Sequence, residues 1–117
     1  MKGISTFTLL VLLLGSPRFT WAADSDRGQT LFGDPALGGS TWGKSCRTCH
    51  ENGEGLRKGF SGQERFTIMG LHQKGLPEAI DFCIQVTMRG EGLEPGSRDQ
   101  ADLMAYLRSL DGKASGK

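Results

Sequence analysis

The 117-residue chain is close to neutral, with 14 basic and 13 acidic residues and a formal net charge of +1. This balance excludes a basic nucleic-acid-binding protein and a basic protein that adheres to membranes. The chain holds three cysteines, so an exported form cannot pair all of its thiols in disulfides.

Residues 1–22 have the layout of a secretory signal peptide. Lys2 is followed by an apolar run over residues 4–14, which is too short to span a bilayer comfortably. Small residues at Thr20 and Ala22 then offer a cleavage site, which we place after Ala22. We therefore expect export to the periplasm and no membrane span in the mature chain.

Removal of residues 1–22 takes away Lys2 and Arg18, so 12 of the 14 basic residues remain beside 13 acidic ones. The mature formal charge is then −1, and no nucleic-acid partner is expected. Residues 23–112 predict one domain, and residues 113–117 predict a flexible tail. We expect this domain to be a monomer.

The mature chain opens with a predicted short helix over residues 24–32. Asp24 or Ser25 can cap this helix, and Asp26 lies in its first turn, where the helix dipole favours an acid. Residues 33–42 are rich in Gly, Pro and Ser, which predicts a loop.

Two further helices are predicted in the C-terminal half. Pro77 suits the first helical position, and the helix continues through Val86 before Gly90 stops it. Ser97 and Gln100 form a capping box that opens the last helix. Its apolar stripe precedes a stop at Gly112 and consists of Leu103, Met104, Leu107 and Leu110.

The other segments predict no regular structure. Residues 51–63 are Gly-rich and polar, which predicts a surface loop. No segment shows sustained alternation of apolar and polar residues, so we expect no sheet and an all-α fold.

The sequence Cys46-Arg47-Thr48-Cys49-His50 forms a C-x-x-C-H motif. One turn of backbone can present both sulfurs to one edge of a porphyrin, while the adjacent imidazole reaches the iron. The motif predicts one covalent haem c per chain, attached through Cys46 and Cys49, with His50 as a metal ligand. A haem also consumes two of the three cysteines and supplies apolar surface to a small core.

Three other readings of the motif are weaker. A thioredoxin-like redox pair needs a strand and a helix around it, and the flanks are loop-rich. A zinc site needs a second ligand pair at similar spacing, and only the isolated His72 and Cys83 are available. A disulfide between Cys46 and Cys49 would close a strained, tight ring.

With these residues the chain resembles the class I c-type cytochromes over nearly the whole mature length. The segments Gly28-x-x-Leu31-Phe32 and Leu103-x-Ala105-Tyr106-Leu107 look like the first and last helices of that family. The resemblance implies a small fold of three or more helices wrapped around one haem, with Gly28, Phe32 and Tyr106 where the two helices cross.

The sixth iron ligand is less well defined by the sequence. The family supplies it between the middle and last helices, and Met88 lies 18 residues before Tyr106, a similar spacing. Cys83 is the rival, because Phe82-Cys83-Ile84 and the residues after it resemble thiosulfate dehydrogenases and related sulfur-oxidising cytochromes, in which the matching cysteine ligates iron. Five positions on a regular helix turn about 140°, so Cys83 and Met88 cannot both face the iron.

Three further side chains are weaker candidates. Met69 lies in a segment that resembles one in small bacterial monohaem cytochromes and could fold over the haem. Met104 belongs to the apolar stripe of the last helix, which favours a place in the core. His72 lies in a polar stretch, which favours a surface position.

These features predict an electron carrier rather than an enzyme, exchanging single electrons between redox protein partners. The chain shows no paired carboxylates, no Ser and His arrangement and no second haem motif. The alternative is a haem subunit or catalyst in thiosulfate oxidation with Cys83 as the axial ligand. A gas sensor whose distal ligand detaches on reduction is a third hypothesis.

Overall fold

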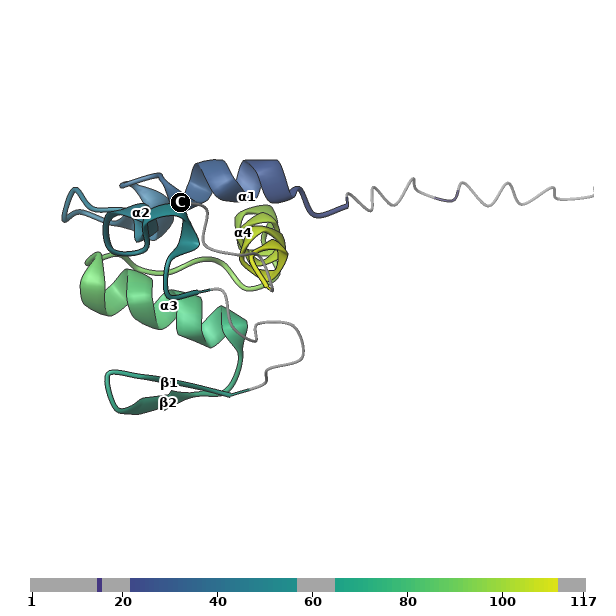
Figure 1. Ribbon diagram of the computed structural model, residues 1–117. Helices are drawn as coiled ribbons and strands as arrows, with labels where there is room; N and C mark the ends of the chain where they lie inside the picture. The colour runs from purple at the N-terminus through teal and green to yellow at the C-terminus, as the bar shows by residue number, and fades with distance from the viewer. Residues whose placement is uncertain (1–14, 16–21, 57–64, 112–117) are drawn as a thin grey trace, which may run out of the picture.

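The computed structural model of the protein describes Gly15, residues 22–56 and residues 65–111. Most of the predicted signal peptide, part of the predicted 51–63 loop, Gly112 and the predicted tail lie outside these residues. In the described part, the chain is mostly helical with one small sheet (Figure 1). The elements follow the order α1 (Ser25–Phe32), η1 (Leu37–Gly39), α2 (Cys46–Cys49), η2 (Glu51–Gly53), β1 (Phe66–Ile68), β2 (Leu71–Gln73), α3 (Leu76–Thr87) and α4 (Arg98–Ser109). Among the described helices, none has the length and apolar character needed to cross a membrane.

The predicted first and middle helices are confirmed. The Asp24 side chain caps α1 by accepting a hydrogen bond of 3.0 Å from the backbone N–H of Arg27, and Asp26 lies in the first turn. Helix α3 begins at Leu76, one residue earlier than predicted, so Pro77 still lies in the first turn, where its missing N–H costs no helical bond.

The predicted last helix is also confirmed, but only one of the two hydrogen bonds of its predicted capping box is present. Ser97 Oγ accepts from the backbone N–H of Gln100 at 3.2 Å. The Gln100 side chain does not return to Ser97; its Oε1 accepts instead from the backbone N–H of Gly96 at 2.9 Å.

The expectation of no sheet was wrong. Strands β1 and β2 pair antiparallel, with Phe66 opposite Gln73 and Ile68 opposite Leu71. The two residues between them, Met69 and Gly70, both have positive φ, of 52° and 80°. A two-residue hairpin turn of this kind matches the twist of its strands. Each strand has only three residues, which is too short for alternation to be visible in the sequence.

Helices α1 and α4 cross closely where the family resemblance placed the crossing. A Cβ at position 28 would overlap the carbonyl oxygen of Asp102 and lie 2.7 Å from Tyr106 Cβ, so glycine is required there. Next to this contact, the rings of Phe32 and Tyr106 lie 5.2 Å apart between centroids, tilted by 59°. That geometry is favourable for two aromatic rings.

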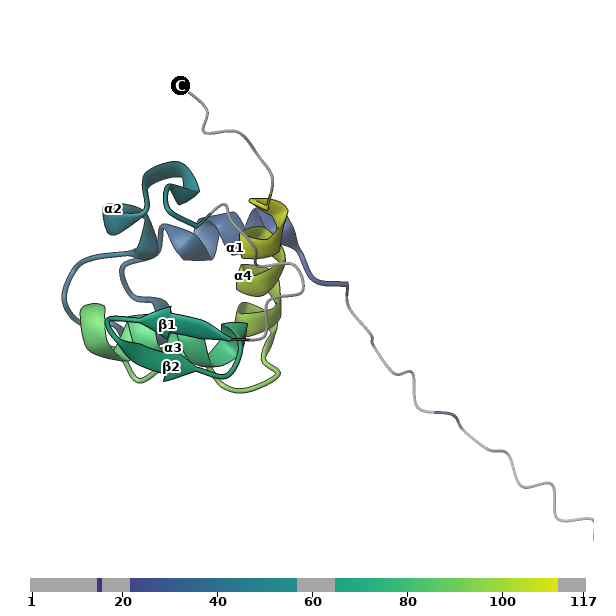
Figure 2. The same ribbon diagram turned by 60° about the horizontal axis from the view of Figure 1, so that its bottom comes forward.

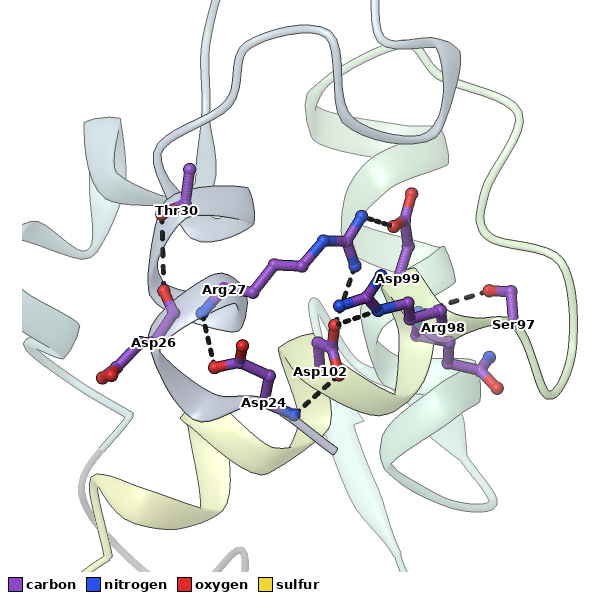
Figure 3. Close-up of polar contacts among 9 residues, drawn as sticks. Asp24, Asp26, Arg27, Thr30, Ser97, Arg98, Asp99 and Asp102 are labelled. Atoms are coloured by element: carbon purple, nitrogen blue, oxygen red, sulfur yellow. Dashed lines mark hydrogen bonds and ion pairs between the residues drawn. The ribbon is translucent and has the colours of Figure 1, made fainter. Parts of the chain in front are cut away.

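A buried carboxylate also holds α1 to α4 (Figure 3). Asp102 is 0% exposed and accepts hydrogen bonds from the backbone N–H of Asp24 at 2.7 Å and from Arg27 Nη1 at 2.8 Å. The hydrogen bond from Asp24 is the largest of the influences that hold the pKa of this carboxyl below its usual range. The start of α1 is therefore fixed to the first turns of α4.

The remaining core lies between this helix pair and α3. The hairpin runs along α3, and the short helix α2 lies beside the C-terminal end of α1, at the same end of the molecule as the C-terminal end of α3 (Figures 1 and 2). The buried apolar side chains are Leu31, Phe32, Leu37, Phe66, Leu76, Ala79, Ile80, Ile84, Met88, Leu93, Leu103, Tyr106, Leu107 and Leu110.

Replacing Gly28 with Ala should destabilise the protein by about 3 kcal/mol, because backbone atoms of α4 cannot move aside like a flexible side chain. Thermal unfolding followed by circular dichroism measures the effect. Gly75→Ala is a suitable control, since a Cβ there meets only Pro77 Cδ at 3.6 Å. Equal melting temperatures for the two variants would contradict the close crossing.

Candidate functional site

The cysteine motif lies on a single helical turn that its neighbours cap. Thr48 Oγ1 accepts from the backbone N–H of Ser45 at 3.0 Å, and the backbone N–H of Thr48 donates to the carbonyl of Ser45 at 3.1 Å. The turn closes with a 2.9 Å hydrogen bond from the N–H of His50 to the carbonyl of Cys46. Cys46, Cys49 and His50 therefore come together on one short, capped turn.

The loop after this turn orients the His50 ring. Nδ1 of His50 lies 2.8 Å from the carbonyl oxygen of Glu54. A carbonyl can only accept, so Nδ1 carries the proton, and Nε2 of the neutral ring keeps its lone pair for a metal. The chain turns back toward His50 through Gly53, at φ 76°, where a Cβ would lie 2.6 Å from Leu110 Cδ1. The backbone thus selects the tautomer that a metal ligand needs.

Arg47 fixes the motif against the first helix. Its guanidinium lies over Gly33 and donates a 3.4 Å hydrogen bond to the carbonyl of Gln29. Helix α1 has no basic residue of its own in its last turn. Arg47 supplies a cation where the helix dipole favours one.

The third cysteine of the chain lies near the motif. Burial raises the pKa of the Cys46 thiol to about 11, and the Cys83 thiol is close enough to add to the increase by charge repulsion. Burial raises the pKa of Cys83 as well. None of the three cysteines forms a disulfide. The structure therefore brings Cys83, from α3, toward Cys46.

Cys83 lies in the middle of the inward face of α3, yet it is only half-buried. Residues three and four positions apart share a helix face. Ala79 and Ile80, one turn earlier, are buried, as is Ile84 beside it. Cys83, which lies between Ile80 and Ile84, and Thr87, one turn after Cys83, remain half-buried. The described side chains therefore do not fully cover this part of the face.

Half-buried apolar and sulfur side chains from other elements also border the core. They are Cys46, Leu56, Ile68 and Met104, from α2, the loop after η2, β1 and α4. With Cys83 they form what we call the apolar collar. Together they form a partly covered surface from several elements, with sulfur atoms among them. A large apolar ligand could bind to this surface.

Met88, the preferred sixth ligand in the sequence, is a core residue. It is 3% exposed and caps the end of α3, where its N–H donates to the carbonyl of Cys83 at 3.3 Å. The Met88 carbonyl accepts from the N–H groups of Thr41 and Trp42, both at 3.3 Å. Its backbone therefore joins the end of α3 to the segment that leads into the motif.

The other candidate ligands lie in three different environments. Met69 is at the hairpin turn and is 72% exposed. His72 is exposed on β2, with Nδ1 3.0 Å from Thr67 Oγ1. Met104 packs half-buried at the edge of the core.

Two features of the site were not found from the sequence. The Glu54 carbonyl, which orients His50, is a backbone group and has no residue signature. The Ser45 and Thr48 cap could have been found, because a Ser at the position before a helical turn is a favoured N-cap.

Comparisons of the chain with protein-family models, with curated proteins and with solved structures gave no match. Among the described residues, no group of three or more His, Cys, Asp and Glu side chains is arranged to hold a metal ion on its own.

Proposed function

We propose that this protein is a periplasmic single-haem c-type cytochrome that carries electrons between redox proteins. The observation that carries the proposal is the capped turn on which Cys46, Cys49 and His50 come together, with Nδ1 of His50 held by the Glu54 carbonyl. Two thiols and an oriented imidazole on one turn form the donor set of a covalently attached haem.

The residues present fit such a group. Cys46 and Cys49 would form the two thioether bonds, and His50 Nε2 would ligate the iron. The half-buried side chains of the apolar collar would pack against the haem and exclude water from it. When bound, the haem supplies an iron that gains and loses one electron; the protein residues hold and orient it.

Cys83 is the sixth ligand that the arrangement favours over Met88. Cys83 lies near Cys46 on the part of α3 that is not fully covered, whereas Met88 is 3% exposed within the core. The exposed turn position of Met69 offers no comparable support. A thiolate ligand would favour the oxidised iron and give a low reduction potential, whereas a thioether would favour the reduced iron.

The same placement of Cys83 supports a second candidate function, a haem subunit or catalyst in thiosulfate oxidation. The resemblance around Phe82-Cys83-Ile84 is to proteins with that activity. The single C-x-x-C-H motif counts against independent activity, so this candidate requires a partner subunit with its own redox centre.

Absorption spectra of the purified mature protein test the carrier function. We expect a low-spin spectrum in both oxidation states, with no change when carbon monoxide is added to the reduced protein, because two axial ligands leave the iron no open position. A high-spin reduced form that binds carbon monoxide readily would reject the carrier and favour a gas-binding role.

A further inference from the structure

An exposed tryptophan lies between two cations beside the cysteine motif. The Trp42 side chain is 47% exposed. Lys44 Nζ lies 4.1 Å and Arg89 Cζ 5.6 Å from the centroid of its ring system. Both distances are within the range of cation–π attraction. We call Trp42, Lys44 and Arg89 the Trp42 surface.

Hydrogen bonds join the two backbone segments that carry this surface. The N–H groups of Thr41 and Trp42 share the carbonyl of Met88, and Thr41 Oγ1 donates to the carbonyl of Arg89 at 3.1 Å. Arg89 adopts φ 55°, a conformation uncommon for a residue other than glycine. Two segments distant in sequence are thus joined at the point where the cations meet the ring. A partner that docks here pays little entropy to order the surface.

No carboxylate of the described residues forms an ion pair with either cation. Ion pairs join Arg27 to Asp99 and Asp102, and Arg98 to Asp102, at the contact of α1 and α4. Lys44 and Arg89 take part in none of them. Their charges are therefore available to an acidic partner, although the mature chain as a whole carries a formal charge of −1.

Two other segments that carry exposed apolar residues lie toward the same end of the molecule. The exposed large apolar residues of the described chain are Trp42, Met69, Leu71 and Val86. The hairpin turn, which holds Met69, and the C-terminal end of α3, which holds Val86, both lie at the end of the molecule that carries α2 (Figures 1 and 2). Exposed aromatic and arginine side chains with apolar neighbours are typical of protein interfaces.

We propose that the Trp42 surface docks the acidic face of an electron-transfer protein. The proposal rests on the proposed electron-carrier function and specifies the partner of that site. Carboxylates of the partner would pair with Lys44 and Arg89, and the indole of Trp42 would be buried at the centre of the contact. Trp42 is four residues before Cys46, so the contact would form beside the haem attachment.

Rates of electron transfer from the reduced, haem-loaded protein to small ions test the charge of this surface. One electron leaves the protein and converts hexacyanoferrate(III) to hexacyanoferrate(II). At low salt, Lys44→Glu and Arg89→Glu should each slow this reaction roughly three- to tenfold, because they remove attraction for the anion. Lys74→Glu is the matched control, since Lys74 is exposed and precedes the opposite end of α3; we expect a change of less than about twofold. Equal slowing by the Lys44 and Lys74 variants would overturn the proposal.

A second measurement tests the docking of a protein. With a cupredoxin of net negative charge as the acceptor, Trp42→Ala should slow electron transfer about tenfold and slow the hexacyanoferrate reaction much less, because only the protein acceptor buries the indole. A variant with the wild-type absorption spectrum and the wild-type cupredoxin rate would overturn the proposed surface and leave the carrier function standing. If the wild-type protein is purified without haem, both the proposed surface and the carrier function are overturned.

Discussion

Replacing both Cys46 and Cys49 with alanine should abolish covalent haem binding. The two thiols lie on one turn, α2, and the third cysteine lies on a different element, α3, so it cannot supply the second sulfur of that turn. Without the haem, the apolar collar would stay uncovered, so we also expect the variant to accumulate poorly in the periplasm. Haem staining after denaturing electrophoresis, with the intact mass of the mature chain, measures attachment. The same mass tests the predicted cleavage after Ala22.

Cys83→Ala is the matched control for that experiment. It removes one thiol that is half-buried, like that of Cys46, but leaves the motif intact, so the covalent haem should remain. Covalent haem in the Cys46→Ala, Cys49→Ala double variant would contradict the assignment of the motif. Loss of covalent haem in the Cys83 variant alone would place an attachment sulfur on α3.

The helices could be predicted because their ends and faces have local causes. Asp24 and Ser97 cap α1 and α4 through side-chain oxygens, and Pro77 restricts the start of α3. Gly28 gave no local signal for a crossing; only the family resemblance placed it there. The close approach of α4 now explains why that position requires glycine.

The hairpin could not be predicted because its turn has no strong signature. Asn-Gly and Asp-Gly are the usual sequences for a two-residue turn with positive φ at both positions. Here Met69 occupies the first position at φ 52°, a conformation that a methionine rarely adopts in isolation. Pairing of β1 with β2 and their packing on α3 impose this conformation, and the turn residues themselves give no sign of these contacts.

The motif could be predicted, but the choice between Met88 and Cys83 depended on information absent from the sequence. The regular-helix argument stated only that the two sulfurs cannot both face the iron, and the structure places Met88 in the core and Cys83 half-buried on α3. That argument could not show which one faces the motif, since that depends on how α3 packs. The end of α3 also departs from regular geometry, because the Met88 N–H and Thr87 Oγ1 both donate to the carbonyl of Cys83.

Replacing Cys83 with Met should raise the reduction potential by on the order of a few hundred mV, because a neutral thioether stabilises ferrous iron where an anionic thiolate stabilises ferric iron. Cys83→Ala should also remove the low-potential spectrum that we expect of the wild-type protein. The thiol itself favours the protonated form, since burial raises its pKa, so iron coordination would have to supply the free energy for its deprotonation. Redox titration followed by absorption spectroscopy measures both variants.

Met88→Leu separates the two sulfurs, because it keeps the volume of a core side chain and removes only the thioether. If Cys83 is the ligand, the Met88 variant should keep the wild-type spectrum and potential. The reverse result, with a near-infrared Met–iron band that is present in the wild type and lost only in Met88→Leu, would make Met88 the ligand. The spectrum of the Cys83→Ala protein and an assay with thiosulfate then decide between the two functions. If the variant keeps the wild-type spectrum, Cys83 has no role in thiosulfate oxidation. If the variant loses that spectrum and the wild-type protein oxidises thiosulfate, the enzyme is favoured over the carrier.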